Sequence, residues 1–265
     1  MAAFTHIHDA GQGRPLVFLH GWSANGAFFG EQESLAARGF RTIAPDLPGH
    51  GSKARPDPRL SIADLSAALA AYLDETRLKD VVLVGWSMGA TVAFDHIARH
   101  GTAGLAGLVV VDMTAKVAND ATWPLGLANG QTLTEMLAAA DRMASAWPRY
   151  APKIARAMFA PGLDPAGDIC RRTALVVETS DGPTMASLWR SLVAADHRET
   201  VRRLDVPLLA VAGAESQLYA PAVSRWIAAN APRGRAVSLA GAGHAPQREQ
   251  PEAFNAAIAA FASHL

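Results

Sequence analysis

Short apolar runs alternate with longer amphipathic stretches over most of the chain. Six runs rich in Val, Leu, Ile and Ala predict strands, at residues 16–19, 41–44, 81–84, 108–111, 206–211 and 236–239. Helical spacing is clearest in 61–76, where Ser61 is expected to be the N-cap, and in 88–99 and 251–264. Because the strand runs are apolar on both faces, the pattern predicts an α/β fold with a mostly parallel, twisted sheet and helices on both faces.

This alternation stops between residues 113 and 195. The segment is rich in Ala, Leu, Met and Trp at helical spacing, and Pro and Gly interrupt it. We expect residues 113–195 to form a helical cap inserted into an α/β core domain made of residues 1–112 and 196–265. A chain of 265 residues has room for one such domain with an insertion.

The pentapeptide Gly85-Trp86-Ser87-Met88-Gly89 lies directly between a predicted strand and a helical pattern. The G-x-S-x-G motif requires this setting, in which a strained turn exposes the serine above the sheet. The helix that begins at Met88 would place its positive end, and the Met88 backbone N–H, beside a developing oxyanion. Ser87 is therefore the candidate nucleophile of a serine hydrolase, and the alternative is a Gly/Ser turn without chemistry.

Two further loops supply candidate partners for Ser87. His20-Gly21-Trp22 follows the first predicted strand, and its glycine allows a turn that directs the Trp22 N–H toward the nucleophile as a second oxyanion donor. His20 is expected to organise this loop and to have no catalytic role. His244 lies in a Gly-rich loop after the last predicted strand, and its imidazole is the candidate base, against the alternative of a surface histidine.

Together, four segments resemble the α/β-hydrolase superfamily: His20-Gly21-Trp22, residues 46–51, residues 85–89 and Gly243-His244-Ala245-Pro246. The resemblance covers the sheet domain and excludes the cap. Within the superfamily these motifs resemble the carboxylesterases of biotin synthesis, which demethylate a pimeloyl ester on acyl-carrier protein. The resemblance implies a small-molecule ester as substrate, either free or carried on acyl-carrier protein.

The acid that would orient His244 departs from the superfamily pattern. It usually follows the next-to-last strand, three residues after a glycine, and that position holds Ser216. Two carboxylates remain, Asp112 after the run 108–111 and Glu215. Asp112 matches the placement in haloalkane dehalogenases, which it resembles in this respect, although it could equally cap the entry into the cap. We expect Asp112 to be the acid, with Glu215 as the alternative.

Charge and composition narrow the partners. Lys plus Arg and Asp plus Glu each total 24, so no charge excess would attract nucleic acid or an anionic membrane. No apolar run approaches the roughly 20 residues of a membrane span, and the N-terminus shows no secretion signal, so we expect a cytoplasmic monomer or homodimer. The single cysteine, Cys170, excludes an internal disulfide and lies in no recognisable motif.

The expected chemistry is hydrolysis of an ester through an acyl-enzyme on Ser87, without a metal or organic cofactor. Apolar cap residues would line a pocket for a short to medium acyl group, with Trp22, Trp123 and Trp147 as candidate substrate contacts. Two alternatives remain. The same residues could open lactones, including acyl-homoserine lactones, or the protein could bind a ligand without turning it over.

Overall fold

A computed structural model describes residues 3–265; Met1 and Ala2, the start of the N-terminus in which no secretion signal is expected, lie outside this range. One seven-stranded sheet organises the chain, in the order β1-β3-β2-β4-β5-β6-β7. β1 pairs antiparallel with β3, and all other pairs are parallel. The strands are β1 (Thr5–Gly11), β2 (Arg14–Leu19), β3 (Phe40–Asp46), β4 (Val81–Trp86), β5 (Leu105–Val111), β6 (Leu208–Gly213) and β7 (Gly234–Leu239).

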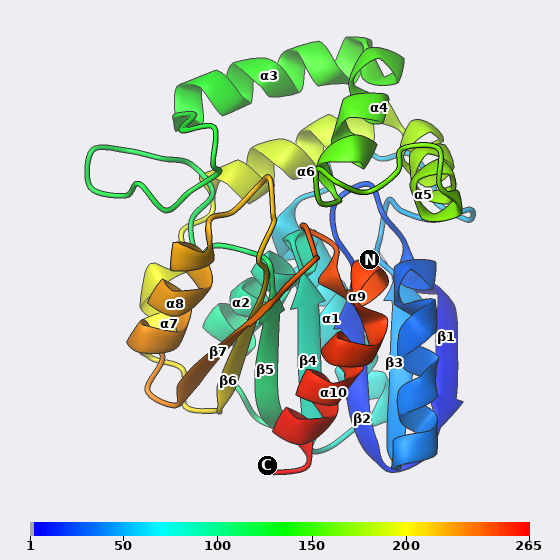
Figure 1. Ribbon diagram of the computed structural model, residues 1–265, viewed down its shortest axis with the longest axis vertical. Helices are drawn as coiled ribbons and strands as arrows, with labels where there is room; N and C mark the ends of the chain where they lie inside the picture. The colour runs from blue at the N-terminus through cyan, green and yellow to red at the C-terminus, as the bar shows by residue number, and fades with distance from the viewer. Residues whose placement is uncertain (1–2) are drawn as a thin grey trace.

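Helices cover both faces of this sheet (Figure 1). The 3₁₀ segment η1 (Gly26–Arg38) and the helices α9 (Pro246–Glu249) and α10 (Pro251–Ala262) pack together on one face. On the other face lie α1 (Ile62–Thr76) and α2 (Met88–His100). Beyond β5, α7 (Arg198–Arg202) packs against α8 (Pro221–Asn230), and α8 contacts β6 and β7. The predicted α/β class, with a mostly parallel sheet covered on both faces, is confirmed.

The central strands are where the prediction from apolar runs works best. Every side chain of β4 and β6 is buried, as a parallel sheet between two helical layers requires. The predicted N-cap is also present, since Ser61 accepts the Asp64 N–H and Asp64 returns a bond to the Ser61 N–H. The apolar runs and the helix cap thus agree with the observed strands and helix, and the buried strands hold the loops at their ends in place.

Four helices cover the end of the sheet toward which β4 and β5 point (Figure 1). They are α3 (Leu133–Ser145), α4 (Trp147–Ala157), α5 (Asp168–Glu178) and α6 (Gly182–Ala194). The two ends of this insertion lie side by side, because Lys116 and Asp196 form an antiparallel bridge and the His197 N–H donates to the Ala115 carbonyl at 2.8 Å. Arg198 pairs with Asp196 at 2.6 Å beside this bridge.

None of the helices among residues 3–265 is both long enough and apolar enough to cross a bilayer.

Candidate active site

Ser87 stands on a strained turn between β4 and α2. Its backbone has φ 53° and ψ −123°, a conformation that non-glycine residues rarely adopt and that is often found at functional sites. The two flanking glycines are required by close approach of backbone: a Cβ at Gly89 would lie 2.0 Å from the Leu19 carbonyl oxygen, and one at Gly85 2.4 Å from the Ala90 Cα. The Ser87 N–H donates to the Val111 carbonyl at 3.0 Å, so the end of β5 holds the turn in place.

The loop after β2 lies directly beside this turn. A Cβ on Gly21 would be 3.2 Å from the Ser87 Cβ, a contact tighter than most side chains make, so the two loops approach closely here. The Trp22 N–H has no backbone acceptor among the described residues. The Met88 N–H, at the first position of α2, has none within its helix. The Trp22 and Met88 N–H groups, on the two segments that meet at Ser87, are therefore without a backbone acceptor within residues 3–265.

Two buried, neutral imidazoles brace the Trp22 loop against the turn after β3. His20 accepts the Leu47 N–H at 2.9 Å and donates to the Gly21 carbonyl at 2.8 Å. His50 accepts the Ser23 N–H at 3.2 Å and donates to the Pro48 carbonyl at 3.1 Å. Burial lowers the pKa of His20 well below its ordinary value and lowers the pKa of His50 to about 4. These contacts agree with the loop-organising role expected of His20.

His244 faces a buried carboxylate. Its Nδ1–H donates to Asp112 Oδ2 at 2.7 Å, and both side chains are almost completely shielded from solvent. The Trp86 Nε1–H donates to the His244 carbonyl at 2.6 Å, which ties the histidine loop to the nucleophile turn. Within the described part of the chain, no hydrogen bond joins the Ser87 hydroxyl to His244; such contacts are often loose before substrate binds.

Asp112 is held by more than its histidine. Its Oδ1 accepts the Gly213 N–H at 3.2 Å, and its Oδ2 also accepts the Ser216 hydroxyl at 2.6 Å. Its backbone has φ 43°, and its own N–H donates to the Val211 carbonyl at 2.7 Å. Glu215, in contrast, has an exposed side chain, and its backbone N–H bonds to the Ala242 carbonyl. The structure thus brings Asp112 to His244 and leaves Glu215 outside this group.

A cavity of about 120 Å³ lies where the cap meets Ser87 and His244. Its wall is mostly apolar and includes residues from the cap and from the turn after β6. The lining residues are Trp22, Ser87, Leu127, Ile154, Ala157, Met158, Trp189, Leu192, Leu218, Tyr219 and His244. Ser87, His244 and the Trp22 ring, all proposed from sequence, therefore share one cavity.

The other two tryptophans proposed as substrate contacts do not line this cavity. The Trp123 ring packs on Trp226 with centroids 4.8 Å apart, and its Nε1–H donates to the Lys116 carbonyl at 2.8 Å. Trp147 lies one layer behind, with its ring edge-on to Trp22 at 5.3 Å. Tyr219, which sequence reasoning missed, lies with its ring 5.8 Å from the His244 ring. No periodicity or motif in the turn after β6, from Gly213 to Tyr219, distinguishes Tyr219 in the sequence.

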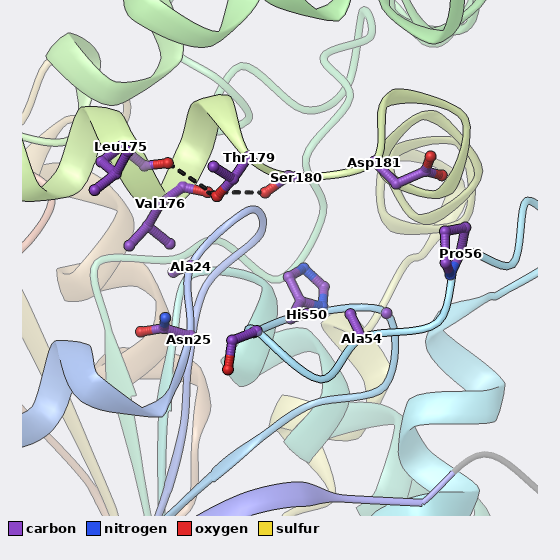
Figure 2. Close-up of a pocket in the computed structure, with 13 residues that line it drawn as sticks. Ala24, Asn25, His50, Ala54, Pro56, Leu175, Val176, Thr179, Ser180 and Asp181 are labelled. Atoms are coloured by element: carbon purple, nitrogen blue, oxygen red, sulfur yellow. Dashed lines mark hydrogen bonds between the residues drawn. The ribbon is translucent and has the colours of Figure 1, made fainter.

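A larger cleft of about 520 Å³ separates the α5–α6 turn from the loops around Asn25 and His50 (Figure 2). Neither Ser87 nor His244 lines it, and the ring nitrogens of His50 are both engaged in the bonds described above. Among residues 3–265 there is no cluster of three His, Cys, Asp or Glu side chains arranged to hold a metal ion. The smaller cavity is therefore the candidate site.

Comparison with known proteins agrees with the fold. The model of the alpha/beta hydrolase family matches residues 16–257. The chain is 26% identical to the AB hydrolase superfamily protein YisY of Bacillus subtilis, over 97% of this chain and 94% of that protein. It is 29% identical to the pimeloyl-[acyl-carrier protein] methyl ester esterase of Nitrosomonas europaea, over 95% and 97%. An esterase from Exiguobacterium antarcticum has the same fold, with a TM-score of 0.89, 20% identity and coverage of 99% and 100%.

The family and the names of these relatives support a hydrolase of the esterase type. The motifs on which the sequence resemblance depends, at residues 20–22, 46–51 and 85–89 and at Gly243–Pro246, all lie within the matched segment. Because the family model matches residues 16–257, most of its length, this chain belongs to the alpha/beta hydrolase family.

Proposed function

We propose that the protein is a serine carboxylesterase that works through an acyl-enzyme on Ser87. The observation that carries the proposal is the buried His244–Asp112 hydrogen bond, at 2.7 Å, beside a strained serine with two available backbone N–H donors. A carboxylate that accepts Nδ1–H leaves Nε2 free to take a proton and stabilises the imidazolium that results. Serine needs such a base, because its hydroxyl is a poor nucleophile at neutral pH.

In the first half of the reaction, Ser87 Oγ attacks the ester carbonyl as His244 Nε2 takes its proton. The N–H groups of Trp22 and Met88 bind the oxyanion, and His244 returns the proton to the departing alcohol. In the second half, a water molecule attacks the carbonyl of the acyl-enzyme as His244 Nε2 takes its proton. His244 then gives that proton to Ser87 Oγ as the bond between Oγ and the acyl group breaks, and the carboxylic acid is released. Asp112 remains ionised throughout.

The cavity indicates the substrate class. Its wall is apolar and carries no Lys or Arg side chain, so it suits an uncharged acyl group and gives no partner to a carboxylate. A cavity of about 150 Å³ holds one benzene molecule, so a volume of about 120 Å³ fits a short acyl chain, with longer chains extending toward the open side. We propose that the substrates are short to medium acyl esters. The specific candidate is the pimeloyl-[acyl-carrier protein] methyl ester, for which several relatives are named. We propose that the enzyme acts in the cytoplasm.

Labelling with a fluorophosphonate tests the nucleophile. We expect a covalent adduct on Ser87, located by mass spectrometry, and no adduct in Ser87→Ala. Hydrolysis of p-nitrophenyl acetate, butyrate, hexanoate and decanoate then tests the pocket, with kcat/KM expected to fall at decanoate. Absence of labelling in a protein that still binds the short esters would favour the binding-protein alternative and refute the proposal.

Two leucines of α6 form a matched pair for the acyl-chain test. Leu192 lines the cavity and Leu188, one turn earlier, is equally buried but does not. Leu192→Ala should move the preferred acyl chain to a longer one, and Leu188→Ala should not. The same enzyme assayed with methyl pimeloyl-acyl-carrier protein and with acyl-homoserine lactones ranks the specific ester against the lactonase alternative.

A further inference from the structure

Ser216 occupies the position from which the superfamily usually supplies its acid, and it contacts the acid that is present. Its hydroxyl oxygen accepts the N–H groups of Leu218 and Tyr219, each at 3.3 Å. The hydroxyl hydrogen is directed to Asp112 Oδ2 at 2.6 Å, the same oxygen that accepts His244 Nδ1–H. The turn after β6 therefore fixes the serine, and the serine fixes the carboxylate.

The sheet explains why these two positions meet. β5 and β6 are neighbouring parallel strands, with Val111 opposite Val211. Asp112 directly follows β5, and Ser216 lies in the turn after β6, so both reach the same edge of the sheet. The same oxygen, Asp112 Oδ2, accepts a hydrogen bond from the Ser216 hydroxyl and another from the His244 imidazole. Only this carboxylate therefore separates the Ser216 side chain from the imidazole.

We propose that Ser216 is a positioning residue for Asp112, and that position 216 remains a second place from which a carboxylate can orient His244. The proposal rests on the esterase function proposed above. The serine hydroxyl gives Oδ2 a second donor on a carboxylate that is almost completely buried, where a charged acceptor with too few donors is costly. The carboxylate is thereby held toward the imidazole instead of turning to other partners.

Substitutions at Ser216 test the positioning role. Ser216→Ala should lower kcat about tenfold, the effect of one bond to a charged group, with KM changed by less than about twofold because Ser216 does not line the cavity. Ser216→Thr, which keeps the hydroxyl, should restore most of kcat. Wild-type kcat in Ser216→Ala, or a loss that Ser216→Thr does not repair, would overturn this role.

The double variant Asp112→Asn/Ser216→Asp tests the second position. We expect it to recover kcat about 100-fold or more over Asp112→Asn alone, because a restored carboxylate can again select the Nδ1–H tautomer. The single variant is its own control, since it keeps Glu215 next to position 216. Circular dichroism and thermal melting identify a variant that does not fold, in which case Ser216→Ala and Ser216→Thr still decide the positioning role.

The two proposals fail in different ways. If wild-type protein is labelled on Ser87 and hydrolyses esters, but the folded double variant is no more active than Asp112→Asn, the second position is refuted and the esterase function is not. If wild-type protein is not labelled, the esterase function itself fails.

Discussion

Replacement of Asp112 by Asn removes one charge at the centre of the candidate site and keeps the shape of the side chain. The structure shows what the amide would meet. Oδ1 accepts the Gly213 N–H, while Oδ2 accepts from His244 and Ser216. If the Asn NH₂ replaces Oδ2, it faces Nδ1 and favours the imidazole tautomer with its proton on Nε2, which cannot act as base.

The opposite orientation of the amide is also unfavourable. An NH₂ group at the Oδ1 position would face the Gly213 N–H, leaving two buried donors against each other at a cost of about 1–3 kcal/mol. Either way the imidazolium loses its counter-charge while His244 remains almost completely buried. We expect kcat to fall by roughly 10³- to 10⁴-fold, about 4–5.5 kcal/mol of transition-state stabilisation, the scale known for the equivalent change in another serine hydrolase.

Steady-state hydrolysis of p-nitrophenyl butyrate measures this loss, with the fraction of labelled Ser87 as a check on the number of active sites. The matched control is Glu215→Gln, which removes a carboxylate near the same sheet edge whose side chain is exposed. We expect this control to stay within about twofold of wild type, since surface changes away from the site have small effects. Equal losses in the two variants, or a larger loss in Glu215→Gln, would refute the assignment of Asp112.

Two further predictions concern the loops around Ser87. Trp22→Phe removes the indole bond to the Met185 carbonyl on α6 (2.9 Å) and should cost about 1 kcal/mol of stability. It should also lower kcat several-fold, because the backbone N–H of the same residue is a proposed oxyanion donor. The control Trp123→Phe removes a similar indole bond away from the cavity, so it should lower the melting temperature by a similar amount and leave kcat unchanged. A fall in kcat in Trp123→Phe would contradict the link between the position of Trp22 and catalysis. The pKa of His50 is about 4 in the folded state against 6.5 in the unfolded state, because burial favours the neutral imidazole. Its contribution to the free energy of unfolding is therefore complete above pH 6.5 and is lost as the pH falls toward 4. That contribution is at most about 3 kcal/mol, so urea titrations from pH 4 to 8 should show a shallower dependence in His50→Gln, and parallel curves would argue against it.

The strands that sequence reasoning found and missed differ in how much of them is buried. Five of the six predicted runs belong to strands that are mostly buried, and their apolar residues mark them. The sixth, at 236–239, lies in the edge strand β7, which is mostly exposed or half-buried but keeps a short apolar run. β1 was missed because it is the antiparallel edge strand, with exposed or half-buried Thr, His and Asp side chains. η1 was missed because it is a 3₁₀ segment with non-helical geometry at Phe29, so its apolar residues do not repeat every 3.6 positions.

The site shows the same division between local and tertiary information. Ser87, Trp22 and His244 lie in turns whose glycines leave room for other segments of the chain, such as Leu19 beside Gly89 and Ala160 beside Gly243, so short glycine-containing motifs identify them. The cavity wall depends on which way the cap helices pack. The large apolar rings of Trp123 and Trp147 predict that both side chains are buried. Whether they pack against a substrate or against other side chains depends on long-range packing. Trp147 donates to the Val177 carbonyl on α5, a contact that no local pattern encodes.

The choice between Asp112 and Glu215 illustrates why placement on the sheet decides more than distance along the chain. Glu215 is next to the usual acid position, yet its backbone bond to Ala242 leaves its side chain facing solvent. Asp112 has a positive φ, which Asp and Asn adopt more readily than most residues, and such strain persists only where the surroundings over-determine it. Here the bonds from Gly213 and Ser216 do so. The turn that usually carries the acid in the superfamily therefore contacts the proposed catalytic group through the carboxylate of Asp112.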